Sequence, residues 1–219
     1  MRRLLTIIFI GIVGITNAND GKFERIMLDN IAALNTARTI EDYQKVVNTL
    51  DRIGAAEADK WEPHYYGAYG NILMSTRVTE LTEKDQYLDA AQLRLDKAVA
   101  IDNNNVEMIT LQGFIHMMRL AADPATRGQI YAGLALEQFN KAVTMDDQNP
   151  RALIMRAQMK QGTAKFFGTS TDEACGEAVK ALELLDQQAA SEPSIAPSWG
   201  RWNAESMVKQ CGAAEKVNE

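Results

Sequence analysis

The chain has 219 residues, enough for one or two domains, and its 46% hydrophobic and 24% charged residues are typical of a globular protein. Its formal net charge of −6 argues against a nucleic-acid-binding protein, which needs clustered basic side chains to meet phosphates. The same acidic balance argues against electrostatic docking on anionic lipid.

Residues 1–18 have the layout of a secretory signal peptide. Arg2 and Arg3 precede an apolar run over residues 4–15, and Thr16-Asn17-Ala18 offers a small residue at each end of a cleavage triplet. The apolar run is shorter than the roughly 20 residues that a spanning helix needs, so we prefer a signal peptide to a membrane anchor. The sequence therefore predicts export to the periplasm of a Gram-negative bacterium, with no transmembrane span after cleavage.

Helical periodicity dominates from Phe23 onward, and no sustained alternation of apolar and polar residues favours a strand. Capping side chains followed by proline, at Asp123-Pro124 and Asn149-Pro150, indicate two of the helix starts. The pattern predicts nine helices, over residues 24–36, 39–55, 61–79, 83–101, 105–121, 125–145, 150–166, 170–190 and 199–214.

An internal repeat is the strongest signal in the chain. Residues 95–105, LDKAVAIDNNN, return 44 residues later as 139–149, FNKAVTMDDQN. Self-similarity at a fixed period in this range is typical of stacked helical repeats. Proteins of that architecture usually present a surface to partners rather than a catalytic pocket.

At these positions the chain resembles tetratricopeptide (TPR) repeat proteins, whose units pair two antiparallel helices. The family's second helix carries small, large apolar and turn residues at fixed spacing, matched here by Ala135, Phe139, Ala142, Met145-Asp146 and Asn149, and one repeat earlier by Ala91, Leu95, Ala98, Ile101-Asp102 and Asn105. The period exceeds the usual roughly 34 residues, so the repeats at 61–104, 105–148 and 149–190 are extended and degenerate.

The resemblance implies an all-α fold, a right-handed α-solenoid of antiparallel helix pairs over residues 19–190. Residues 191–198 contain two prolines and three serines and are predicted to form a linker. The helix after it, within the segment 191–219, contains Trp199, Trp202 and Met207, and we expect it to act as a C-terminal capping helix that shields the last repeat.

Cys175 and Cys211 are the only cysteines. In an oxidising compartment an even pair favours one disulfide, which would join the last segment to the preceding helix. Two unpaired buried thiols are the alternative.

No pattern of residues points to catalysis, a metal or a cofactor. His64 and His116 are the only histidines and lie in different repeats, whereas a metal site needs three or four convergent ligands. The segment 162–170 lacks the lysine after its second glycine, and the preceding strand, that a phosphate-binding loop requires. We therefore expect no enzymatic activity.

The first helices of the repeats are rich in aromatic residues and methionines. Tyr and Trp are enriched at binding hot spots, and Met adapts to irregular ligands, although both also fill cores, the role we favour for Trp61 and Tyr65. The predicted partner-binding residues are Tyr66, Tyr69, Phe114, Met117, Met118 and Gln158.

These observations predict an exported TPR-like scaffold or adaptor that binds a protein or peptide partner in the cell envelope through the concave surface of the first helices. A periplasmic small-molecule or glycan-binding protein is the alternative, with Tyr66, Tyr69 and Phe114 as stacking groups. A hydrolase or its accessory subunit, and a self-assembling structural protein, are further alternatives.

Overall fold

The structure is a computed structural model that describes residues 16–190 and 193–215. This part of the chain contains nine α-helices and no strand, which confirms the predicted all-α class. The helices are α1 (Thr16–Thr36), α2 (Ile40–Ala56), α3 (Glu62–Ser75), α4 (Leu81–Ile101), α5 (Val106–Ala122), α6 (Pro124–Met145), α7 (Pro150–Phe167), α8 (Asp172–Ala189) and α9 (Arg201–Glu215).

Most of the predicted signal peptide, residues 1–15, lies outside the described residues, and residues 16–18 begin α1. That helix starts eight positions before the expected residue 24. No helix in the described ranges is long and apolar enough to cross a membrane.

Side-chain caps define several helix starts. Thr39 and Asp42 form a reciprocal capping box at α2, in which the Thr39 hydroxyl accepts from the Asp42 N–H. Asp123 and Asn149 accept from backbone N–H groups at the starts of α6 and α7, each directly before a proline, as predicted. These bonds satisfy N–H groups that have no partner within the helix.

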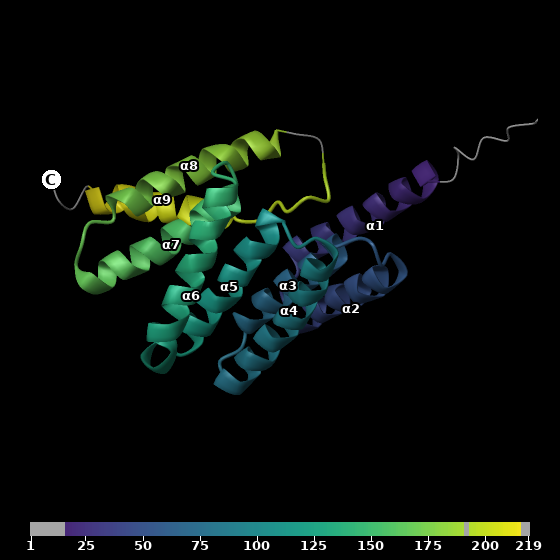
Figure 1. Ribbon diagram of the computed structural model, residues 1–219, viewed down its shortest axis with the longest axis horizontal. Helices are drawn as coiled ribbons and strands as arrows, with labels where there is room; N and C mark the ends of the chain where they lie inside the picture. Colours follow the sequence, from purple (N-terminus) through teal and green to yellow (C-terminus); the bar gives the residue numbers. More distant parts are fainter. Residues whose placement is uncertain (1–15, 191–192, 216–219) are drawn as a thin grey trace, which may run out of the picture.

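Successive helices pack as hairpins, α3 with α4, α5 with α6 and α7 with α8, and the hairpins stack beside one another (Figure 1). The first helices of the pairs also meet, since α3 contacts α5 and α5 contacts α7. The duplicated segments occupy equivalent places, because Leu95 in α4 and Phe139 in α6 are both fully buried, as are Ala98 and Ala142. The two copies of the sequence repeat therefore have the same pattern of buried positions.

The chain after α8 turns back instead of continuing the stack. Residues 193–200, which we call the strap, run without helical structure to α9, which packs against α8 and α7 (Figure 1). A disulfide joins Cys175 in α8 to Cys211 in α9, which confirms the predicted pairing. The last helix starts at Arg201 rather than at residue 199 because Gly200 has φ +106°, which is not a helical conformation. Residues other than glycine rarely adopt this φ.

Gly113 lies where α5 comes closest to α6. An added Cβ would stand 2.5 Å from Cε1 of Phe139, whose ring is fully buried and cannot move aside. We predict that Gly113→Ala lowers the free energy of unfolding by about 1–3 kcal/mol, measured by urea denaturation. Gly133→Ala on the exposed face of α6, where no atom lies within 4 Å, is the control and should be neutral or stabilising. Equal losses in both variants would contradict this packing.

The disulfide closes a loop of 36 residues. We predict that reduction, or the double variant Cys175→Ser/Cys211→Ser, lowers the free energy of unfolding by about 3–4 kcal/mol, because the unfolded chain regains the entropy of the open loop. Urea denaturation with and without reductant measures the loss. The double variant should be insensitive to reductant, and an unchanged midpoint for the reduced wild type would refute the prediction.

Candidate functional site

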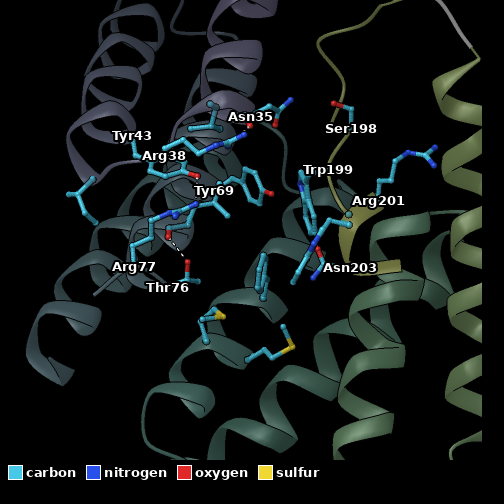
Figure 2. Close-up of a pocket in the computed structure, with 18 of the residues that line it drawn as sticks. Asn35, Arg38, Tyr43, Tyr69, Thr76, Arg77, Ser198, Trp199, Arg201 and Asn203 are labelled. Atoms are coloured by element: carbon cyan, nitrogen blue, oxygen red, sulfur yellow. Dashed lines mark hydrogen bonds between the residues drawn. The ribbon is translucent and has the colours of Figure 1, made fainter. Parts of the chain in front are cut away.

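A cavity of about 1230 Å³ opens between the N-terminal helices and the C-terminal segment. Small-molecule sites usually enclose about 300–1,000 Å³, so this cavity, which we call the cleft, is large enough for a sizeable ligand. Its walls come from the α1–α2 turn, α2, α3, α5, α7, the end of the strap and the start of α9 (Figure 2).

Three aromatic rings form one wall of the cleft. Trp199 from the strap stacks on Tyr69 of α3, with ring centroids 5.0 Å apart and planes 16° apart. Its ring also stacks on Phe114 of α5, at 5.6 Å and 30°. Trp199 is only 7% exposed and Phe114 only 8%. Such stacked pairs add stability beyond their buried area, and they give the cleft a flat apolar surface.

A buried hydrogen-bond relay lies behind this wall. The Trp199 Nε1–H donates to the Tyr65 hydroxyl over 2.8 Å, and that hydroxyl donates to Glu107 Oε2 over 3.1 Å. Arg151 Nε donates to the same carboxylate over 2.9 Å, and Asn149 Nδ2 over 2.6 Å. The relay thus connects the strap, α3, α5 and the start of α7.

Electrostatics keep two donors of the relay, Tyr65 and Arg151, protonated. Burial, reinforced by the Glu107 charge, raises the pKa of Tyr65 well above its ordinary value, so the phenol keeps the proton that it donates. Burial alone would lower the pKa of Arg151, but the adjacent Glu107 carboxylate outweighs it and raises that pKa. Both donors are therefore fully protonated at neutral pH.

Arginines gather at the other side of the cleft. Arg77 donates to the Tyr43 hydroxyl over 3.1 Å, and its guanidinium lies 5.2 Å from the centroid of the Tyr43 ring. Arg38 donates to the Ala37 carbonyl over 3.1 Å. Figure 2 shows these three side chains facing the cleft across from Trp199.

No carboxylate lines the described walls of the cleft, and neither Arg38 nor Arg77 forms an ion pair within the described residues. Arg201, by contrast, pairs with Asp186 at 2.7 Å. In a chain of net charge −6, a cavity that presents two arginine guanidinium groups without an ion-pair partner among the described residues favours an anionic group.

The structure brings most of the predicted binding residues together. The predicted residues that line the cleft are Tyr69, Phe114, Met117, Met118 and Gln158. Tyr66 does not line it. Its side chain is 2% exposed, and its hydroxyl donates to the Ala196 carbonyl over 2.9 Å, so Tyr66 holds the strap instead. Tyr65 is fully buried, which confirms the predicted core position.

The sequence predicted a linker over residues 191–198 but not its contacts with the cleft, and it did not identify Arg38 or Arg77 as lining residues. Trp199 was expected in a capping helix, but it precedes α9 and lines the cleft. Tyr43, Arg38 and Arg77 line the cleft as well. A usable signal was present: Pro197-Ser198-Trp199-Gly200 places a large aromatic residue between a helix-breaking proline and a glycine, where it cannot be part of a regular amphipathic face.

A second cavity of about 640 Å³ lies between the start of α6 and the end of α7. Its described lining contains no charged side chain, and on its rim Phe166 is 83% exposed and Phe167 69% exposed. Without convergent charged groups it is less specific than the cleft.

No protein-family model matches the chain, and no curated protein matches it. Among solved structures it is similar to the HusA haemophore from Porphyromonas gingivalis, with 28% sequence identity and a TM-score of 0.76. The similarity covers 87% of this chain and 92% of the haemophore. The two proteins therefore share their helical arrangement over nearly their whole lengths.

Both histidines lie outside the cleft, and burial lowers the pKa of His64 and of His116 below the ordinary 6.5. Below about pH 6.5 the unfolded chain therefore binds more protons than the folded one, and stability present above that pH is lost as pH falls. We predict that the free energy of unfolding decreases between about pH 7.5 and pH 5.5, and that the double variant His64→Gln/His116→Gln shows a smaller decrease. Urea denaturation across this range measures both slopes, and identical slopes would rule out a contribution from these histidines.

Proposed function

We propose that this protein binds a planar, largely apolar anion of the haem class in the cleft and acts as a haem-binding protein outside the cytoplasm. The observation that carries the proposal is the joint presence of a stacked aromatic wall and unpaired arginines in one cavity. Haem combines a flat apolar macrocycle with two propionate carboxylates on one edge. The macrocycle matches the aromatic wall of the cleft, and the propionates match the arginines on the opposite side.

The contacts can be assigned side by side. The exposed parts of the Trp199 and Phe114 rings would give the macrocycle an apolar wall, and the thioethers of Met117 and Met118 suit its apolar edge. Arg38 and Arg77 would receive the propionates, since a guanidinium matches a carboxylate with two parallel hydrogen bonds. Methionine and tyrosine are also known iron ligands of haem proteins, and the cleft contains both.

The similarity to a haemophore over nearly the whole of both chains supports this choice among the possible planar anions. The arrangement of the cleft also favours a small ligand over the peptide partner expected from the repeat pattern, because the strap already covers part of α3 and α5. A neutral glycan would leave the arginines without partners, so the stacking residues alone do not favour a sugar.

We also propose that the stacked hairpins form a TPR-like right-handed solenoid with α9 as its cap, and that residues 1–18 direct export to the periplasm. The equivalent burial of Leu95 and Phe139 supports the first statement. The disulfide supports an oxidising compartment such as the envelope or the extracellular space.

Titration of the purified protein with haemin, followed by the haem absorbance spectrum and by tryptophan fluorescence, tests the proposal. We predict saturable one-to-one binding, and about 3–10-fold weaker binding for Arg38→Gln and for Arg77→Gln, because each loses an exposed charge pair with a propionate. Haemin dimethyl ester, which lacks the propionate charges, should bind the wild type more weakly and should no longer distinguish the variants.

Arg52→Gln is the matched control. Arg52 is an exposed arginine on α2 that lies outside the cleft and donates to the Thr49 hydroxyl, so its replacement changes net charge without changing the site. Absence of saturable haemin binding, or equal affinities for the control and both cleft variants, would refute the proposal.

A further inference from the structure

The strap has no regular secondary structure, yet it delivers Trp199 to a defined position in the cleft. Its backbone is attached through the Tyr66 hydroxyl, which donates to the Ala196 carbonyl. Its indole is attached through the Tyr65 hydroxyl. Gly200, at its end, packs closely on α7, where an added Cβ would stand 3.5 Å from Cγ of Arg151.

The Tyr65 hydroxyl orients the Trp199 indole. It accepts the indole N–H and donates its own hydrogen to Glu107, so the two bonds fix the orientation of the indole relative to α5. Glu107 is itself held by Arg151, and Arg151 NH1 donates to Gln188 Oε1 in α8 over 3.0 Å. The indole of Trp199 is therefore connected, through Tyr65, to a buried ion pair that joins α5, α7 and α8.

Packing alone does not account for this ion pair. Glu107 is 6% exposed and Arg151 3% exposed, whereas most of the other buried residues of α5 and α7 are apolar, including the fully buried Ile115 and Ile154. Buried ion pairs contribute little net stability compared with well-packed apolar residues, and orientation is the role for which they are best known.

We propose that the Glu107–Arg151 pair, acting through the Tyr65 hydroxyl, positions Trp199 as a fixed wall of the cleft, so that the cleft is already shaped for its planar ligand before binding. The inference rests on the proposed function for the identity of the ligand. Tyr65 and Glu107 are positioning residues, because neither needs to touch the ligand. A wall that is ordered in advance removes the entropy cost of ordering it during binding.

Tyr65→Phe tests the relay because it deletes a single hydroxyl and leaves Glu107 paired with Arg151 and Asn149. The first measurement is hydrogen exchange of the Trp199 indole N–H by NMR without ligand, with the resonance assigned from its loss in Trp199→Phe. We expect exchange at least about tenfold faster in Tyr65→Phe than in the wild type, with backbone amide protection in α3 and α5 unchanged.

The second measurement is haemin affinity, which we expect to fall about 3–10-fold in Tyr65→Phe because the strap must then be ordered on binding. Tyr131→Phe, a hydroxyl deletion in α6 outside the cleft, is the matched control and should change neither quantity. Unchanged indole exchange in Tyr65→Phe would overturn the relay, and faster exchange with unchanged affinity would overturn its role in the ligand site.

The two proposals fail in different ways. Indole exchange is measured without ligand, so a lack of haemin binding by the wild type would refute the proposed function and leave the relay measurement intact. If the wild type binds haemin and Tyr65→Phe matches it in both measurements, only the relay is refuted.

Discussion

The hydrogen bonds to the Glu107 carboxylate are the interactions on which the rest of the structure depends. The carboxylate is buried in α5, yet it receives hydrogen bonds from Tyr65 in α3, from Arg151 in α7 and from Asn149 at the cap of α7. Removing one partner of such a group leaves a buried charge without compensation, which is far more costly than never having placed it there. The register of three helices is therefore set at one residue, and the position of the strap follows from it.

The stacked hairpins form the frame of the molecule, and the cleft carries the residues of the candidate site. Apolar contacts such as Phe139 against Gly113 bring α5 and α6 to close approach and make a rigid frame. The cleft lies along the frame's N-terminal side, where the strap closes it. Its chemistry differs from the acidic balance of the whole chain, since its described lining contains arginines and no carboxylate. This contrast, together with the haemophore similarity, leads to the proposed ligand.

Local sequence patterns predicted the helices well because helical periodicity marks each of them and side-chain caps mark the starts of several. The boundaries at Asn105, Asp123 and Asn149 are examples, since each of these residues has a short polar side chain that accepts a hydrogen bond from the first turn of its helix. The disulfide was predicted from an even pair of cysteines in a chain expected to be exported, and Tyr69, Phe114, Met117 and Met118 were predicted from the aromatic residues and methionines of the first helices. The linker at residues 191–198 was predicted, but its placement in the cleft was not, because the contacts that place it join Tyr65 to Trp199 over 134 positions and Tyr66 to Ala196 over 130. Arg38 and Arg77 resemble ordinary surface residues until the fold places both in the lining of the cleft, where neither guanidinium has an ion-pair partner among the described residues.

The disulfide also bears on the cleft. Cys211 lies in α9, and the strap that carries Trp199 leads directly into this helix. The bond holds α9 covalently to α8 and so restrains the downstream end of the strap. Reducing the bond would leave that end held only by packing and hydrogen bonds, so the wall beside Trp199 would lose rigidity without losing any of its own residues.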